Sequence, residues 1–187
     1  MARRTRADME QTRATLLAVA RQLFSETGYA EASMDDLTAR AGLTRGALYH
    51  HFGDKQGLLA AVVAQIDAEM DERLKALSDQ APTPWDGFLE RCRAYLRMAL
   101  EPEIQRIVLR DARVVLGARE DERCIASMRE LIEQSAIVGV DAEALARMVH
   151  GSLTEAAFWI ARGEDDAARL EQAGAALDLL LRNLSPE

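Results

Sequence analysis

The sequence predicts an all-α protein of about nine helices, and three observations support this fold class. The 187 residues are 49% hydrophobic and 29% charged, an ordinary balance for a folded chain that lies well outside the disordered class. Only four prolines interrupt a composition rich in Ala, Leu, Glu and Arg, and the straight-chain members of this set lose little rotamer freedom in a helix. Apolar residues recur at helical spacing, and no alternating β-branched run predicts a strand.

The first three predicted helices form a small N-terminal head and cover residues 8–27, 34–41 and 44–50. Ser33 is expected to cap the second helix, because its hydroxyl can accept hydrogen bonds from the free amides of the first turn. Gly28 and Gly42 follow the first and second helices and supply the backbone conformation that commonly ends a helix. The core expected between these helices contains Leu37, Leu43 and Leu48.

A long helix and five later helices follow the head. Residues 54–78 keep an apolar stripe for about six turns, so this helix is expected to connect the head with the rest of the chain. Pro82 and Pro84 mark the clearest break after it. We therefore predict two domains, residues 1–53 and 54–187. The remaining helices are expected at about 85–99, 104–117, 121–135, 141–161 and 165–184.

Charge is distributed unevenly between these two parts. The formal net charge of the whole chain is −8. Residues 1–60 carry eight basic and seven acidic side chains, a net charge of +1, whereas the remaining residues carry 15 basic and 24 acidic side chains, a net charge of −9. Such an asymmetry suggests a head that faces nucleic acid on an acidic body.

Residues 33–52 fit a helix-turn-helix, in which two short helices are joined by a turn of three or four residues. Arginine can bridge guanine edges or phosphate, and Thr, Tyr and His donate to phosphate oxygens, while a glycine permits close approach to the groove floor. These residue types predict a surface for double-stranded DNA, although a tight helical hairpin inside a larger bundle would show the same pattern. The side chains expected to point outward are Thr44, Arg45, Gly46, Tyr49 and His50.

Residues 12–63 resemble the DNA-binding head of the tetracycline repressor (TetR) family of bacterial regulators. The resemblance is carried by the runs LAVARQLF at residues 17–24, GY at 28–29 and AGLTRGALYHHF at 41–52, and GDKQGLL at 53–59 completes it. Thr38 is a departure, because the family usually has alanine at this close approach of two helices. Threonine is only slightly larger, so we expect a small shift in packing rather than loss of DNA binding.

The resemblance implies a role for each head residue. Ser33 would cap the second helix and touch phosphate, and Lys55 would contact phosphate from the start of the fourth helix. Arg45 would read a base edge, while Thr44, Tyr49 and His50 would hold the backbone or adjacent bases. The basic residues near the N-terminus have two interpretations, a solvated tail or an arm that enters the minor groove or neutralises phosphate. They are Arg3, Arg4 and Arg6.

The last two predicted helices carry small residues and an apolar stripe. By analogy with the family they would form a four-helix interface with a second subunit, although packing within one chain explains the same composition equally well. A dimer would place two heads at half-sites about one helical turn apart. The candidate interface residues are Leu145, Ala146, Leu153, Ala157, Ile160, Ala173, Leu177 and Leu180.

An effector pocket is expected among the fourth to eighth helices. Apolar walls would favour a lipophilic ligand, and the acidic body would favour a cationic one. The resemblance thus implies a repressor that binds a palindromic operator as a homodimer and is released by a small effector, with the fourth helix coupling pocket to head. Candidate pocket residues, each of which is otherwise plain core or surface, are Trp85, Phe88, Cys92, Tyr95, Met98, Arg110, Asp111, Met128, His150, Glu155, Phe158 and Trp159.

Other functional classes have less support. No nucleophile elbow, phosphate loop or zinc spacing is recognisable, so neither an enzyme nor a cofactor is expected. His50 and His51 would point about 100° apart on a helix and cannot jointly hold a metal. A helical adaptor that uses the head for protein contacts is the alternative. Cys92 and Cys124 suggest two buried thiols or a redox-sensing pair, and the absence of a signal peptide or membrane-length apolar stretch predicts a cytoplasmic protein.

Overall fold

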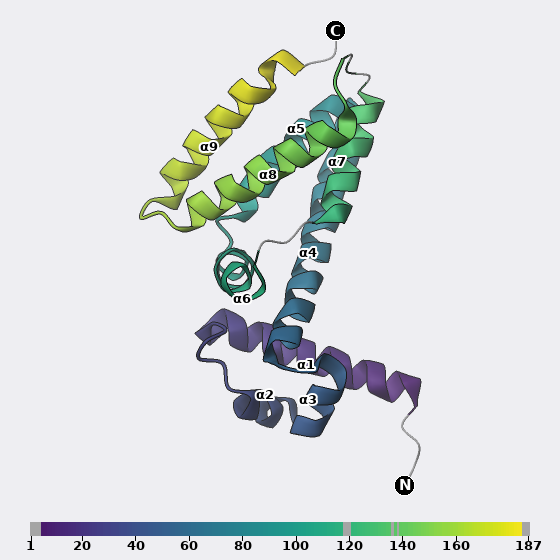
Figure 1. Cartoon of the computed structure of the whole chain (residues 1–187), viewed down its shortest axis with the longest axis vertical. Helices are drawn as coiled ribbons and strands as arrows, with labels where there is room; N and C mark the ends of the chain where they lie inside the picture. Colours follow the sequence, from purple (N-terminus) through teal and green to yellow (C-terminus); the bar gives the residue numbers. More distant parts are fainter. Residues whose placement is uncertain (1–4, 118–120, 136, 138, 185–187) are drawn as a thin grey trace. The chain divides into compact units, whose positions relative to one another are not determined.

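The computed structural model describes residues 5–117, 121–135, 137 and 139–184, and it folds them into helices (Figure 1). The prediction of an all-α chain of about nine helices is confirmed over this part of the chain. The elements are α1 (Arg6–Thr27), α2 (Met34–Ala41), α3 (Arg45–Phe52), α4 (Lys55–Asp79), α5 (Pro84–Met98), a π-helix (Ile104–Ala112), α6 (Arg113–Leu116), α7 (Glu122–Gln134), α8 (Ala142–Ala161), α9 (Asp166–Leu181) and a 3₁₀ turn (Arg182–Leu184).

The described residues divide into two compact units. The head unit contains the chain up to Ile66 together with a segment that begins at Arg106, and the body unit contains Asp67–Gln105 and the C-terminal helices. The sequence predicted a domain boundary after residue 53. The observed division differs from this boundary, because the first turns of α4 and the segment from Arg106 pack with the head. Periodicity along the sequence does not reveal such a return of the chain to an earlier unit.

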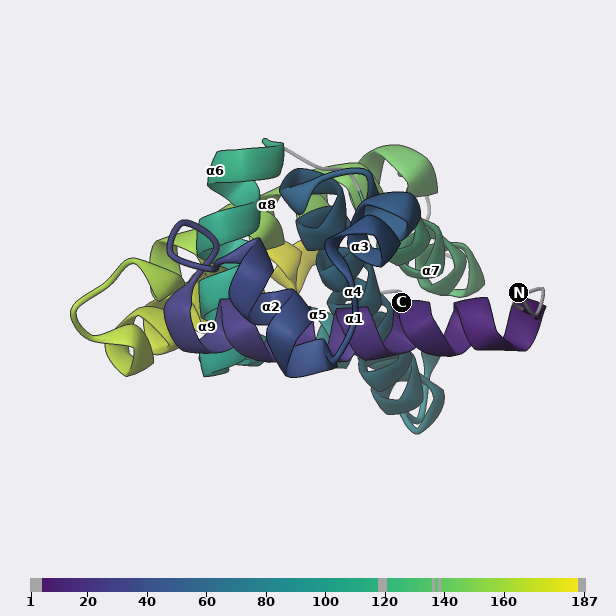
Figure 2. The same ribbon diagram turned by 90° about the horizontal axis from the view of Figure 1, so that it is seen from below.

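The head unit is built around the buried stripe of α1. Leu16, Ala20 and Phe24 are fully buried, and α2 and α3 pack against this helix, as the view from below shows (Figure 2). Leu37 and Leu48 are also fully buried, as expected, whereas Leu43 is half-buried. The three-helix core therefore forms where the apolar spacing predicted it.

Side chains fix the helix starts in the head. The Ser33 hydroxyl accepts hydrogen bonds from the amides of Asp35 and Asp36 at 3.2 and 3.4 Å, which confirms the predicted cap. A capping box that the sequence analysis missed begins α1: the Asp8 amide donates to the Thr5 hydroxyl at 3.2 Å, and the Thr5 amide donates to the Asp8 carboxylate at 2.9 Å. Each cap satisfies amides that have no partner within the helix.

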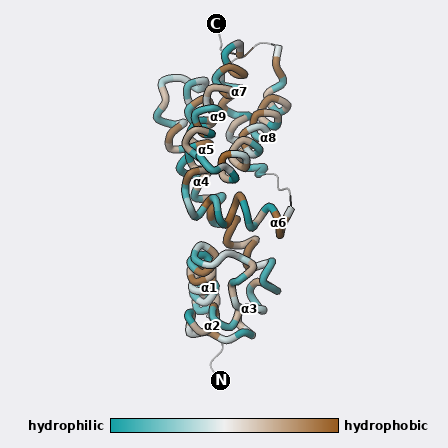
Figure 3. The backbone as a smooth tube through the Cα atoms, turned by 90° about the vertical axis from the view of Figure 1, so that its left-hand side faces the viewer, coloured by the Kyte–Doolittle hydropathy of each residue, from teal (hydrophilic) through white to brown (hydrophobic). Residues whose placement is uncertain are grey.

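The body unit is a bundle in which α5 packs against α7, α8 and α9. Figure 1 shows α8 and α9 side by side, and in Figure 3 the tube changes between polar and apolar colours along the helices, as amphipathic helices do. Phe88 and Ile160 are fully buried, and the ring of Trp85 stacks on Phe88 with centroids 5.2 Å apart. Apolar burial of this kind is the main favourable term in the folding of the bundle.

A charged side chain is buried among these apolar helices. Arg91 is 2% exposed, and its Nη2 donates to the carboxylate of Asp71 and to Cys124 Sγ, the latter at 3.6 Å. In the part of the chain that the structure describes, Arg91 Nε and Nη1 have no hydrogen-bond partner. Burial raises the pKa of Cys92 to about 12 and also raises the pKa of Cys124, so both thiols are protonated at neutral pH.

The helix expected over residues 104–117 differs from the prediction in its winding. Residues Ile104–Ala112 form a π-helix, and only Arg113–Leu116 continue as α-helix. The wider turn buries Ile104, Ile107, Leu109 and Ala112. Apolar spacing does not distinguish a π-helix from an α-helix over so few residues, because both place residues four apart on one face.

None of the described helices has both the length and the apolar character needed to cross a membrane.

Candidate nucleic-acid interface

The turn between α2 and α3 is fixed by backbone geometry. Gly42 adopts the left-handed conformation (φ 64°, ψ 29°), which glycine reaches without steric cost. The next amide, that of Leu43, donates to the carbonyl oxygen of Thr38 at 3.0 Å. Thr44 then caps α3, because its hydroxyl accepts a hydrogen bond from the Ala47 amide at 3.2 Å. The α2–turn–α3 unit thus begins and ends at defined caps.

One face of α3 is buried and the other is open. Ala47 and Leu48 pack into the head, and the opposite face carries exposed side chains. Tyr49 is 46% exposed, a large fraction for an aromatic residue on a helix whose other face is core. The exposed set is Thr44, Arg45, Gly46, Tyr49 and His50, which are the residues that the sequence assigned to DNA contact.

The arginine on this face has an intramolecular partner that the sequence analysis missed. Arg45 Nε and Nη2 donate to the two carboxylate oxygens of Asp35, which lies in the first turn of α2. The pair joins residues ten apart in sequence across the turn. Helical spacing within one element could not have predicted it, because the pair depends on how α2 and α3 cross.

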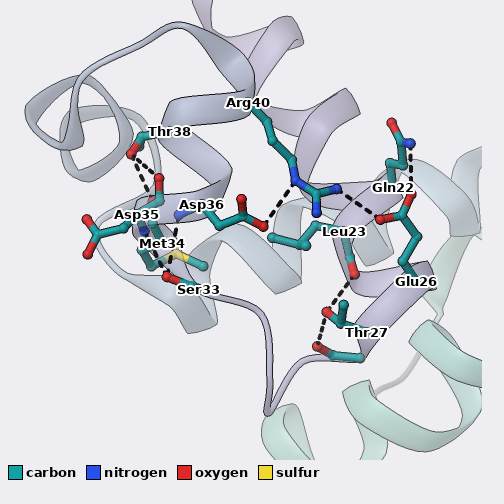
Figure 4. Close-up of polar contacts among 11 residues, drawn as sticks. Gln22, Leu23, Glu26, Thr27, Ser33, Met34, Asp35, Asp36, Thr38 and Arg40 are labelled. Atoms are coloured by element: carbon teal, nitrogen blue, oxygen red, sulfur yellow. Dashed lines mark hydrogen bonds and ion pairs between the residues drawn. The ribbon is translucent and has the colours of Figure 1, made fainter.

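A second arginine fastens α2 to α1 beside this surface. Arg40 Nη1 lies 2.9 Å from the Glu26 carboxylate, and its Nε lies 3.0 Å from the Asp36 carboxylate (Figure 4). The hydrogen bond from Arg40 is the main reason that the pKa of Glu26 is lowered. The ion pair with Glu26 joins α2, the helix that carries Asp35, to α1, whereas the pair with Asp36 lies within α2.

Three further residues that were predicted to contact DNA lie outside α3. Lys55 is half-buried: its Nζ donates to the Ala30 carbonyl oxygen at 3.2 Å and lies 4.6 Å from the centre of the Tyr29 ring. Arg6 forms an exposed ion pair with Glu10 at 3.0 Å. Ser33 is exposed and serves as the cap of α2. Arg3 and Arg4 lie outside the described residues.

Thr38 is 6% exposed and directs its hydroxyl back into its own helix. The hydroxyl donates to the carbonyl oxygens of Met34 and Asp35 at 3.0 and 3.1 Å (Figure 4). The polar atom that distinguishes this residue from alanine therefore has a partner, so its burial leaves no unsatisfied donor.

Two of the predicted effector contacts belong to the head unit instead of the body. Asp111 accepts a hydrogen bond from the Tyr29 amide at 2.7 Å, and Arg110 is exposed. Arg106, which was not predicted to have a role, donates from Nη2 to the Thr27 carbonyl oxygen at 2.6 Å. These contacts join the segment 106–116, here called the docked segment, to the last residue of α1 and to the loop that follows it.

The other predicted effector contacts lie in the body unit at different depths. Glu155 and Trp159 are exposed, and Phe158 is half-buried with the Arg162 guanidinium 5.1 Å from its ring centre. Tyr95 is half-buried, and burial raises the pKa of its hydroxyl to about 12. The buried members of the predicted set are Trp85, Phe88, Cys92, Met98, Met128 and His150.

Of the eight candidate dimer residues, most face the chain's own core. Leu180 is 67% exposed, and Leu145 and Ala173 are half-buried. The large apolar residues that α8 and α9 leave exposed are Met148, Trp159, Leu179 and Leu180. The candidates buried within the chain are Ala146, Leu153, Ala157, Ile160 and Leu177.

Two family models match the sequence. The model described as bacterial regulatory proteins, tetR family, matches residues 16–62, which contain α2, α3 and most of α1. The model described as tetracyclin repressor-like, C-terminal domain, matches residues 85–184, which is more than half of the chain.

Solved structures and curated proteins are similar to the chain as well. A TetR-family transcriptional regulator from Pectobacterium atrosepticum is 66% identical, with a TM-score of 0.91 over 98% of this chain and 99% of that chain. SmeT, the repressor of the Stenotrophomonas maltophilia multidrug efflux pump SmeDEF, is 25% identical, with a TM-score of 0.65 over 94% of this chain and 91% of that chain.

The curated relatives are matched over a smaller part of their length. The HTH-type transcriptional repressor BepR of Brucella suis is 31% identical over 107 residues, 57% of this chain and 51% of BepR. The HTH-type transcriptional regulator AcrR of Shigella flexneri is 37% identical over 86 residues, 46% of this chain and 39% of AcrR. The matched part thus spans about half or less of these two relatives.

Proposed function

Because the chain belongs to the TetR family of bacterial transcriptional regulators, we propose that it binds a palindromic operator as a homodimer and represses transcription until a small lipophilic effector releases it. The family consists of transcription factors, which confirms the prediction of a DNA-binding regulator that is not an enzyme. The single observation that carries the proposed DNA contact is the exposed face of α3, because it presents an arginine, an aromatic residue and a glycine opposite a buried face.

The proposed contacts follow from what each exposed side chain offers. Arg45 reads a base edge, since a guanidinium can donate two hydrogen bonds to one guanine. Tyr49 and His50 donate to phosphates or adjacent bases, and Gly46 lets the helix approach the groove floor. Lys55 exchanges its hydrogen bond to the Ala30 carbonyl for a phosphate oxygen, which is the stronger acceptor because it is charged.

Repression relieved by a ligand requires that head and body influence one another. The chain passes from one unit to the other within α4 and again at the start of the docked segment, which Arg106 and Asp111 join to the head. We propose that an effector which prefers one arrangement of the body helices shifts these two connections and thereby the heads. Such coupling requires a difference in effector affinity between the two states.

The effector class is inferred from the buried members of the candidate pocket together with the half-buried Tyr95. Trp85, Phe88, Met98 and Met128 offer apolar surface, and His150 and Tyr95 offer polar atoms that could fix the orientation of a ligand. This composition favours a largely apolar molecule with one or two polar groups. The names of SmeT and BepR record repression, and we extend that sign of regulation to this chain as part of the proposal.

The proposed dimer uses α8 and α9, but Leu180 is the only large exposed residue that it shares with the sequence-based set. Met148 on α8 is 72% exposed, and Leu179 and Leu180 on α9 are exposed as well. Large apolar side chains that one copy leaves open are the ones a second copy would cover. Small residues beside them, such as Gly151 and Ala176, would let helices approach closely.

A charged substitution on the exposed apolar face of α8 and α9 tests the proposed dimer. Leu180→Glu is expected to shift the protein from dimer to monomer in sedimentation or light-scattering measurements, because the carboxylate would be desolvated in the contact. Val114→Glu is the matched control, since Val114 is 86% exposed in the head unit and the same change there should leave the dimer intact. A dimer that withstands Leu180→Glu would place the contact elsewhere.

DNA binding is tested by fluorescence anisotropy on the chain's own upstream intergenic DNA and on a scrambled duplex over a salt series. We expect tight, sequence-selective binding that falls steeply with salt, because neutralised phosphates release counterions. Tyr49→Ala should weaken operator binding about tenfold. Lys55→Ala should weaken binding to all duplexes and lower the salt slope by about one.

Lys75→Ala provides the control for that experiment, because Lys75 pairs with Asp79 at 2.7 Å in the body unit and should not affect DNA. Selectivity for another duplex but not for the upstream region would mean that the operator lies elsewhere on the chromosome. A folded dimer that binds no duplex in a salt-sensitive way would mean that the head serves a protein partner, as an adaptor would.

A further inference from the structure

The hydrogen bonds between Asp35 and Arg45 join α2 and α3 at the surface of the helix-turn-helix. Arg45 Nε donates to one carboxylate oxygen and Nη2 donates to the other. Asp35 lies in a capped helical turn, in which its amide donates to the Ser33 hydroxyl at 3.2 Å. The guanidinium of Arg45 is therefore held by α2, although its backbone belongs to α3.

The pairing leaves one edge of the guanidinium open. A guanidinium is planar and carries five N–H donors. Asp35 takes the Nε–H and one Nη2–H, so the edge formed by Nη1 and the second Nη2–H faces away from the carboxylate. That edge matches the two acceptors, N7 and O6, which guanine presents in the major groove. Arg45 can therefore bind a guanine without leaving Asp35.

We infer that Asp35 is a positioning residue for base reading, which holds the Arg45 guanidinium so that its open edge meets a guanine. This inference rests on the proposed function, since it takes Arg45 as the residue that reads a base. A side chain fixed before binding loses less conformational entropy in the complex. A carboxylate near DNA also repels phosphates, so Asp35 lowers the affinity for every duplex while it raises discrimination between duplexes.

Asp36 offers a matched control in the same helical turn. Its carboxylate lies 3.0 Å from Arg40 Nε, and Figure 4 shows Asp36 directed toward Arg40 while Asp35 points to the other side. Asp35→Asn and Asp36→Asn each remove one negative charge from the start of α2, so they change helix stability and phosphate repulsion alike. Only Asp35→Asn takes a charged partner from Arg45.

The test is a double-mutant cycle read out as DNA specificity. Duplexes enriched from a random-sequence library by the wild-type protein serve as the operator, and a scrambled duplex of the same composition serves as the reference. Dissociation constants for both duplexes are measured at one salt concentration for the wild type, Asp35→Asn, Asp36→Asn, Arg45→Ala and the double variant that lacks both Asp35 and Arg45. Melting temperatures verify that each variant is folded.

We expect Asp36→Asn to strengthen binding to both duplexes alike and to leave their affinity ratio unchanged. Asp35→Asn should strengthen binding to the scrambled duplex and lower the ratio about three- to tenfold. The base pair at which it loses discrimination should be the one that Arg45→Ala also stops reading. In the Arg45→Ala background, Asp35→Asn should leave the ratio unchanged.

Two results would overturn the role of Asp35: an equal effect of both asparagine variants on the ratio, or a loss of discrimination by Asp35→Asn that persists without Arg45. A wild-type protein that enriches no sequence would instead refute the proposed function, and the role of Asp35 in base reading with it. The two failures are therefore distinguished by the wild-type measurement alone.

Discussion

Asp71→Ala is expected to destabilise the body unit by about 3 kcal/mol, because it leaves the guanidinium of Arg91 charged and buried without its carboxylate. The loss should appear in urea denaturation followed by circular dichroism at a fixed protein concentration, since dimerisation would make the apparent stability depend on concentration. Asp71→Asn should lie between the wild type and Asp71→Ala, because the amide keeps a hydrogen-bond acceptor and loses the charge.

Arg91→Met is the informative partner of that experiment. It removes the buried charge together with two nitrogens that lack hydrogen-bond partners among the described residues, and it leaves the partly exposed Asp71 to be solvated. We therefore expect it to cost less than Asp71→Ala, on the order of 1 kcal/mol, because methionine fills a similar volume. If Arg91→Met were the more damaging change, the pair would owe its stability to packing of the arginine stem instead of charge compensation.

Gly28→Ala is expected to destabilise the head unit by about 2–3 kcal/mol. Gly28 has φ 81° and ψ 167°, a backbone region that only glycine occupies readily. A Cβ at this position would also meet the guanidinium of Arg106, which donates to the Thr27 carbonyl oxygen. The substitution should therefore lower the melting temperature of the head and weaken DNA binding in proportion to the unfolded fraction.

Gly46→Ala is the matched control, because it introduces the same methyl group into the same unit. The nearest atom to a Cβ at Gly46 is the Thr44 hydroxyl oxygen at 3.9 Å, and the residue lies inside α3. The head of the Gly46→Ala variant should be about 0.5 kcal/mol more stable than that of the wild type, because alanine has the higher helix propensity. Its operator affinity should fall if α3 lies close to the groove floor. Equal stability of the two alanine variants would show that the conformation of Gly28 carries no strain for other residues.

The helices of the head show how much of the structure apolar spacing and helix caps can predict. The bounds predicted for α2 coincide with those observed, because Ser33 and Gly42 mark both ends by local chemistry. The open face of α3 also follows from spacing, since Leu48 had to be buried and the residues opposite to it could not be. Local signals were sufficient here because caps and helical faces depend on residues within one turn of each other.

The sequence did less well in the body, where burial depends on which helices become neighbours. Residues such as Ile160 and Leu177 form an apolar stripe that suits an interface, yet in this chain they pack against neighbouring helices of the same copy. The buried Arg91 was not singled out at all, since arginine normally lies at the surface. A stripe indicates that something covers a face, but it does not say what covers it.

The sequence by itself determined the all-α class, the helix-turn-helix head and the membership of a regulator family, because these depend on periodicity, caps and short motifs. Only the tertiary structure decided that Asp35 holds Arg45, that Asp111 belongs to the head and that Met148 is open while Ile160 is not. The physical reason is the same in each case. These contacts join residues from different helices, and the crossing of two helices is set by the packing of all their side chains together, which no local pattern records.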